Sequence, residues 1–262
     1  MPAQKTEFAL KEMRSELNGF LQFLKTRKVV DDAGSTYGIG DALNESKSAN
    51  GILKWGYKSG KLALRLTAGS VICPAQTQSL ACSLEISVEG EIRLPVKADG
   101  DLTWAILQTA MNLEFSAESS TVGTGWSQFW HLDTHIDPPL STPPVEAHPM
   151  FHLHFGGDRM AARRRAKPGC WGQMLEMSGP RFAHPPMDLI LALDFVLANA
   201  TGAKWKDELC KAKEYTGAVR NSQRRFWKPY KETLVDFYSC DRQKQQNHPA
   251  RLLWPTLRVK AV

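Results

Sequence analysis

The chain has 262 residues, of which 42% are hydrophobic and 23% charged, a composition typical of a globular protein with a sizeable core. It contains no run of about 18 apolar residues, and its N-terminal stretch is polar and charged, which argues against a membrane-spanning protein and a cleaved signal peptide. We therefore expect a cytoplasmic protein with no membrane partner.

Positive charge is concentrated in the C-terminal part of the chain. From residue 159 onward there are 20 Lys+Arg and 9 Asp+Glu, so this part carries +11, whereas residues 1–158 carry −5. This asymmetry predicts a surface that faces a polyanion on the C-terminal side. The five cysteines include no CxxC pair, and their odd number argues against a disulfide scaffold or a cysteine-only zinc site.

Hydrophobic spacing predicts helices first and strands afterwards. Apolar residues recur at helical spacing over 5–25, and a second helix is expected over 42–58. From residue 61 the period changes to two, which predicts strands at 61–66, 81–88, 91–96, 110–117, 127–136 and 150–155. Turn signals at 88–91 and 98–101 and the short spacings between strands favour antiparallel pairing.

Helical spacing returns after residue 157. Pro185 and Pro186 precede an apolar segment over 187–199, predicted to be a central helix, and a long helix is expected over 204–238 with a kink at Pro229. The expected fold class is α+β, an antiparallel β-meander of about five to seven strands flanked by an N-terminal helix and a C-terminal helical region. We expect a single domain over 1–262, made of an N-terminal helical part, a sheet and a basic helical part at 1–58, 59–157 and 158–262.

Six of the seven histidines fall between positions 131 and 184. Alternate residues of a strand share a face, so His131, Asp133 and His135 lie on one face of their strand, and His152 and His154 on one face of the next. If the two strands pair, these groups form one patch. Neutral imidazole and carboxylate are the usual ligands of zinc, manganese and iron, so we predict a divalent metal held by His131, Asp133, His152 and His154.

A structural interpretation of the same residues stays open, in which the histidines pair with Asp133, Asp137 and backbone groups on a polar sheet face. The Pro-rich segment 136–149 decides between the two, because it determines whether the strands on either side of it pair. Asp194 poses a related question. It lies in the apolar segment 187–199, so its burial would demand a partner.

Two short motifs and one order of segments resemble known families. His131-x-Asp133 resembles the HxD of iron/2-oxoglutarate dioxygenases, and His152-x-His154 resembles the metal sites of cupins. The order of helix, strands, Pro-rich linker, histidines, cysteine and Pro-initiated helix resembles the ubiquitin-conjugating fold. That resemblance would make Cys170 the thioester nucleophile and His152 or His154 the loop histidine. The Asn of the family's HPN motif is absent, because Met150 follows His148-Pro149.

Basic residues form two clusters that could bind phosphate or nucleic acid: Arg163, Arg164 and Arg165 in a loop, then Arg220, Arg224, Arg225 and Lys228 on the last helix. The second cluster recurs at three-to-four spacing beside Phe226, Trp227 and Tyr230. Arginine with neighbouring aromatic rings is typical of nucleic-acid binding, although a solvated helix face explains the same residues.

These patterns together predict a metal-dependent hydrolase acting on a phosphate-containing substrate, nucleic acid included. The metal would activate water, and His135 or His184 would serve as the proton donor. One alternative is a non-enzymatic subunit that binds nucleic acid or a protein partner in a larger intracellular complex. The other is a ubiquitin-conjugating-like protein with Cys170 as nucleophile.

Overall fold

The computed structural model describes residues 2–29, 52–58, 62–67, 79–93, 106–118, 125–135, 151–155, 182–246, 248 and 250. Helix α1 spans Pro2–Thr26. The strands are β1 (Ile52–Lys58), β2 (Leu62–Thr67), β3 (Ser79–Arg93), β4 (Ile106–Glu118), β5 (Gly125–His135), β6 (Phe151–Phe155) and β7 (Phe182–Ala183). The C-terminal part contains α4 (Leu189–Ala200), the π-helical turn η1 (Trp205–Leu209), α5 (Lys213–Ser239) and α6 (Arg242–Gln245).

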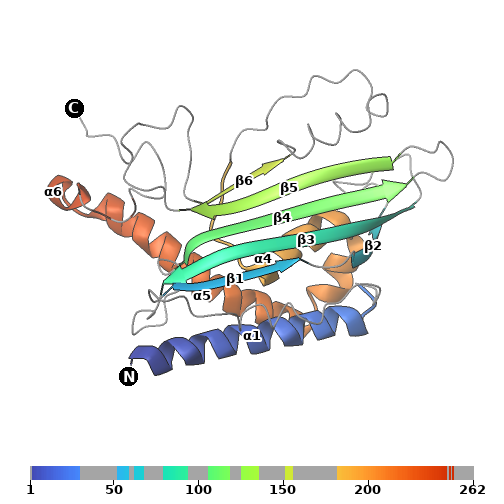
Figure 1. Ribbon diagram of the computed structural model, residues 1–262, viewed down its shortest axis with the longest axis horizontal. Coiled ribbons are helices and arrows are strands. Elements are labelled where there is room, and N and C mark those ends of the chain that lie inside the picture. The colour runs from blue at the N-terminus through green and yellow to red at the C-terminus, as the bar shows by residue number, and fades with distance from the viewer. Residues whose placement is uncertain are drawn as a thin grey trace, which may run out of the picture.

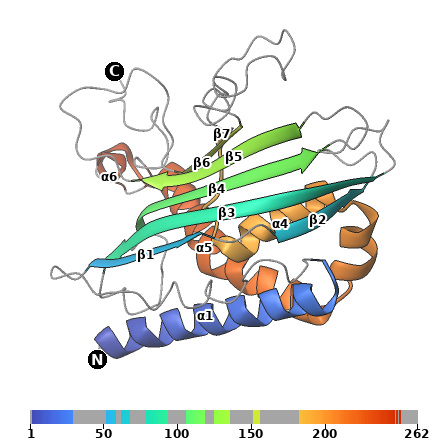
Figure 2. The same ribbon diagram turned by 45° about the vertical axis from the view of Figure 1, so that its right-hand side comes forward.

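The strands form an antiparallel sheet with the order β1-β3-β4-β5-β6-β7, and β2 pairs with β3 as well (Figure 1). β1 pairs with residues 87–93 of β3, while β2 pairs with residues 79–84 of the same strand. Because β4 occupies the other edge of β3, β1 and β2 lie end to end along one edge and do not pair with each other. Figure 2 shows them following each other along β3.

The prediction of a meander of five to seven strands is wrong. Where the structure describes side chains, the strand residues belong only to β5 and β6, which form one small antiparallel pair. Most of the other residues with described side chains are helical. The backbone pairing also departs from a meander at its beginning, where the first two strands share one edge of β3. A strand as long as β3 has room for two short neighbours on one edge, which the spacing of apolar residues does not reveal.

Two local predictions in this region are also wrong. The end of the helix expected over 42–58 is strand β1, because Leu53, Trp55 and Tyr57 alternate with polar or small residues at the period of a strand. Residues 42–51 lie outside the described residues. The turn expected at 88–91 lies inside β3, where Gly90 pairs with Trp55 and Thr109. Alternation continues through Gly90, so the chain keeps its direction there.

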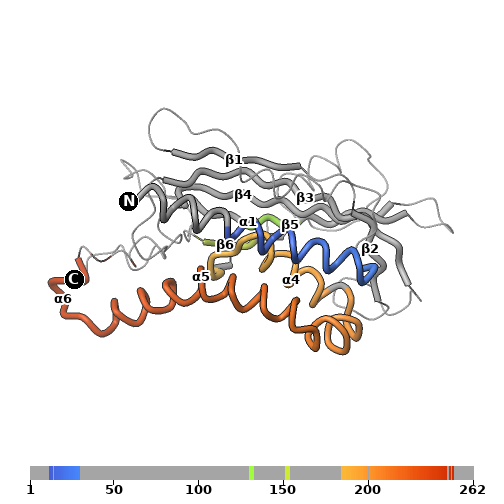
Figure 3. Tube along the Cα trace, turned by 90° about the horizontal axis from the view of Figure 1, so that it is seen from below, coloured from blue at the N-terminus to red at the C-terminus, as the bar shows by residue number. Residues whose placement is uncertain are grey.

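The helices form a layer on one side of β5 and β6 (Figure 3). α1 buries the stripe Met13, Leu17, Phe20, Leu21 and Leu24, as its spacing predicts. α4 is apolar on nearly all sides, and seven of its residues from Leu189 to Leu197 are buried, which confirms its central position. Asp188 caps α4 by accepting a hydrogen bond from the Leu191 amide at 3.0 Å. The long helix starts later than predicted, at Lys213, and runs through Pro229.

Candidate metal site on the polar face of the sheet

The pairing of β5 with β6 brings four predicted metal ligands into register. His131 is the direct partner of His154, and Asp133 is the direct partner of His152. Direct partners in an antiparallel pair lie on the same face, and so do residues two apart along a strand. His131, Asp133, His152 and His154, which we call the His/Asp quartet, therefore occupy neighbouring positions on one face. The Pro-rich segment between the strands does not separate them.

The dimensions of the quartet follow from sheet geometry. Direct partners have Cβ atoms about 5 Å apart, and residues two apart along a strand lie about 6.7 Å apart. The four residues thus mark a rectangle whose half-diagonal is about 4 Å, within which imidazole and carboxylate groups can converge on one ion. His135 falls on the same face of β5, one step beyond Asp133, where β4 provides Gln108 as its partner.

Two members of the quartet are described to the side chain. His152 is 3% exposed and His131 is half-buried. The side chains of Asp133, His135 and His154 lie outside the described residues. Among the side chains that the structure does describe, no group of three His, Cys, Asp or Glu is arranged to hold a metal ion. The quartet is accordingly defined here by its backbone register.

The opposite face of the same two strands is apolar and faces the helices. Trp130, Leu132, Phe151 and Leu153 are each at most 6% exposed. The Trp130 ring meets Phe195 of α4 edge-on at 5.2 Å, and the Phe151 ring meets Tyr230 of α5 at 5.8 Å. Because strand residues alternate between faces, the quartet lies on the side of the sheet away from α4 and α5.

The strand register places further residues beside the quartet that the sequence pattern did not identify. Asn112 of β4 is the partner of His131, and Ala110 is the partner of Asp133. Across the next ladder, Glu89 of β3 is the partner of Ala110. Asn112 and Glu89 continue the polar face beside the quartet, with the small Ala110 between β5 and β3. The alternation of polar and apolar residues within β3 and β4 was the available signal, but their order in the sheet was needed to align them with β5.

His184, the other predicted proton donor, lies on the helix side of the sheet. Its backbone amide donates to the Phe151 carbonyl at 3.0 Å, and its ring packs edge-on against Phe195 with centroids 6.3 Å apart. Nδ1 lies 2.5 Å from the Pro185 carbonyl oxygen, to which it donates. Burial lowers the pKa of His184, while the bond to Pro185 acts in the opposite direction. The structure does not bring this imidazole to the quartet.

The basic residues of α5 divide between two environments. Arg225 lies inside: its Nη2 donates to Glu16 of α1 at 2.5 Å, and its Nη1 lies 3.9 Å from the Asp188 carboxylate. Its side chain is 13% exposed, so it is not available to a phosphate ligand. Arg220, Arg224 and Lys228 are exposed on the outer side of the helix. Arg224 and Arg225 are adjacent in sequence, which in a helix separates them by about 100°.

Burial raises the pKa of Asp188, although its hydrogen bonds and the charge of Arg225 act against this effect. Asp188 therefore stabilises the structure through an ion pair and a helix cap, while the desolvation of its carboxylate is unfavourable. Glu16 accepts a second hydrogen bond, from Asn221 Nδ2 at 2.8 Å. The cluster joins α1, the start of α4 and α5, which is a structural role.

Asp194 has the partner that its apolar surroundings demand. Its Oδ1 accepts hydrogen bonds from Trp205 Nε1 at 2.9 Å and from the Tyr215 hydroxyl at 2.6 Å. Burial raises the pKa of Tyr215 far above its ordinary value, and the charge of Asp194 adds to this effect. Tyr215 thus remains a proton donor to Asp194 at neutral pH. The three groups link α4, η1 and α5, and we assign them to the core.

The remaining predicted site residues, Arg163, Arg164, Arg165 and Cys170, lie outside the described residues, as does the rest of segment 156–181. The ubiquitin-conjugating resemblance depends on that segment and stays a prediction. In the part of the chain that the structure describes, no helix combines the length and apolar character needed to cross a membrane. No protein-family model, no curated protein and no solved structure matches the chain.

Proposed function

We propose that the His/Asp quartet binds one divalent metal ion, zinc, manganese or iron, and that the protein is a metal-dependent hydrolase of a phosphate-containing substrate. The observation that carries the proposal is the register of β5 and β6, in which His131 faces His154 and Asp133 faces His152. Three imidazoles and a carboxylate form a ligand set that suits these metals.

The chemistry of the proposed site follows from the ion. A bound divalent metal lowers the pKa of a coordinated water to about 7, which supplies hydroxide for attack on phosphorus at neutral pH. His135 is the candidate proton donor, because it shares the quartet's face, whereas His184 lies on the other side of the sheet. The +11 charge of residues 159–262 favours an anionic substrate.

Metal content measured on the purified protein is the first test. We expect about one equivalent of zinc, manganese or iron per chain, and a lower melting temperature after chelation, because a ligand that binds only the folded state stabilises it. Asp133→Asn and His154→Ala should lose the metal. His248→Asn is the matched control, since this histidine lies beyond α5 and contacts Asp236. Metal-free protein whose melting is unchanged by chelator would refute the site.

Hydrolysis is tested separately with bis-p-nitrophenyl phosphate, a generic phosphodiester. The metal-loaded protein should release nitrophenolate, and Asp133→Asn should abolish the activity. His135→Ala should retain the metal and lower the rate about 10²–10⁴-fold, as expected for loss of a general acid. If His135→Ala is as active as the unaltered protein, the proton donor is another group. Stoichiometric metal without hydrolysis of phosphate esters would leave a metal-binding protein and refute the hydrolase.

A further inference from the structure

Helix α5 presents one continuous outer face that the core does not use. Arg220, Arg224, Lys228 and Lys231 follow one another at intervals of four, four and three residues, and all four are exposed. This spacing keeps them on one side of the helix. Val235 and Tyr238 continue the row and are 65% and 70% exposed, the large hydrophobic residues most open to solvent among those described. We call these six residues the α5 outer face.

Charge on this face is only weakly compensated. Lys228 pairs with Glu232 at 3.8 Å, but both side chains are more than 60% exposed, and such pairs contribute little. Among the described residues, no ion pair reaches Arg220 or Arg224. This contrasts with Arg225, whose charge is paired with Glu16 and Asp188 inside the protein. The outer face is therefore free to attract an anionic partner.

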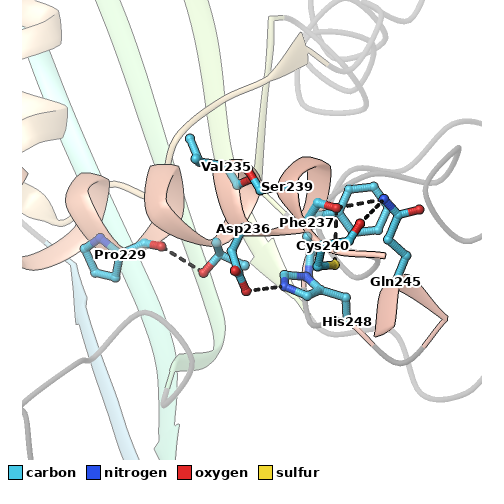
Figure 4. Close-up of polar contacts among 10 residues, drawn as sticks. Pro229, Val235, Asp236, Phe237, Ser239, Cys240, Gln245 and His248 are labelled. Atoms are coloured by element: carbon cyan, nitrogen blue, oxygen red, sulfur yellow. Dashed lines mark hydrogen bonds and ion pairs between the residues drawn. The ribbon is translucent and has the colours of Figure 1, made fainter. Parts of the chain in front are cut away.

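The far end of α5 is held in place by the residues that follow it (Figure 4). His248 Nε2 lies 2.9 Å from Asp236 Oδ2, and its ring packs against Phe237 with centroids 5.5 Å apart. Gln245 Nε2 donates to the Phe237 carbonyl at 2.9 Å. These contacts fix the last turn of the helix, so Tyr238 is presented from a rigid support that a ligand need not order on binding.

We propose that the α5 outer face binds single-stranded nucleic acid. The four cations span about 17 Å at 1.5 Å per residue, so they match a linear polyanion rather than one isolated phosphate. The exposed ring of Tyr238 supplies a surface on which a base can stack at the end of the row. The inference stands independently of the metal site, which lies on the other side of the sheet.

The same face fits other partners less well. A helix that lies on a membrane surface carries an apolar stripe along its length, whereas here the two exposed hydrophobic residues, Val235 and Tyr238, lie together at one end. A second copy of the chain in antiparallel contact would bring Lys228 and Lys231 of the two helices against each other. Like charges at that distance oppose pairing.

Binding can be measured by fluorescence anisotropy with a labelled 20-residue oligothymidylate over a salt series. Four phosphate contacts predict a slope of log affinity against log salt of about −2.8, from about −0.7 per contact on single strands. Reversing two cations in Arg224→Glu/Lys228→Glu should lower affinity at least about tenfold and reduce the slope by about 1.4 or more. Lys206→Glu/Lys211→Glu, a double reversal at two exposed positions before α5 and outside this face, is the charge-matched control.

Tyr238→Ala separates stacking from charge. It should weaken binding roughly 5- to 150-fold with little change in salt slope, because stacking is not ionic. Circular dichroism checks that each variant keeps its helix content. The proposal is overturned if the unaltered protein does not bind the oligonucleotide, or if the double reversal binds with the same affinity and slope. Binding to phosphatidylserine vesicles in place of the oligonucleotide would also overturn it and assign the face to a membrane.

Discussion

Replacing Arg225 tests whether this residue holds the helices together or is available to a ligand. Its guanidinium lies between two carboxylates, with Nη2 2.5 Å from Glu16 and Nη1 3.9 Å from Asp188. The three side chains are 13%, 17% and 11% exposed, so solvent screens them only partly. Arg225→Met retains most of the apolar stem and removes the charge, which leaves two mostly buried carboxylates facing each other.

The expected cost is that of removing one partner from a buried ion pair, about 3–5 kcal/mol. At roughly 2–4 °C per kcal/mol for a protein of about this size, the melting temperature should fall by about 10 °C. Arg224→Met is the matched control, because it changes the adjacent residue identically at an exposed position. Its effect should stay within about 0.5 kcal/mol. Urea unfolding gives the free energy and thermal unfolding the melting temperature, both followed by circular dichroism.

The loss of folding stability caused by Arg225→Met should also depend on pH. Burial already raises the pKa of Asp188, and loss of the Arg225 charge raises it further. Between the ordinary pKa of 3.8 and the raised value, the folded state holds a proton that the unfolded state has released. Stability then falls as pH rises through this window, so the difference between Arg225→Met and the unaltered protein should be smallest near pH 4 and grow toward neutrality.

A double-mutant cycle with Glu16→Gln completes the test. If the ion pair is the cause, the two substitutions together should cost less than the sum of their separate effects, by roughly 0.5–3 kcal/mol. The reasoning is refuted if Arg225→Met is no more destabilising than Arg224→Met. It is refuted equally if the deficit of Arg225→Met shrinks as the pH is raised.

Two further substitutions test the interior of the helical layer. Tyr215→Phe removes the hydroxyl that donates to Asp194 at 2.6 Å and should cost about 1.5–3 kcal/mol in urea unfolding; a loss below 0.5 kcal/mol would contradict the assigned bond. His184→Gln should flatten the pH dependence of stability, because burial lowers the pKa of His184 below 6.5. The stability gained from the neutral ring is present above that value and is lost as pH falls below it, so an unchanged slope between pH 7 and 5 would exclude the effect.

The predictions from sequence succeeded where one period governs a whole segment. The stripe from Met13 to Leu24 and the apolar run after Asp188 each identify a buried helix. Apolar residues that recur every 3.6 positions lie on one side of a helix, and that side packs against the core. The alternation of polar and apolar residues around His131 and His152 likewise predicted strands β5 and β6. At 52–58 a short strand was mistaken for the end of a helix, since seven residues are few for distinguishing the two periods.

Contacts between distant segments could not be predicted in this way. Arg225 and Glu16 are 209 residues apart, so nothing in the local spacing distinguished Arg225 from the exposed Arg224 beside it. The partners of Asp194 lie 11 and 21 residues further along, past the end of its helix. The demand for a partner followed from the apolar neighbours of Asp194, but its identity depended on how η1 and α5 fold back onto α4.

The sheet separates the two proposed sites, and this constrains the hydrolase. The quartet lies on the polar face of β5 and β6, while Trp130 and Phe151 on the other face pack against α4 and α5. The exposed cations of α5 point away from that core, and Arg225 is neutralised within it. The strand register places Lys54 and Lys58 of β1 on the quartet's face, on either side of Gly56, but β1 is three strands, or about 14 Å, away from β5. A phosphate bound at the quartet would contact the metal ion rather than these distant lysines or the cations of α5. Its affinity should therefore follow metal occupancy and be indifferent to substitutions on the α5 outer face.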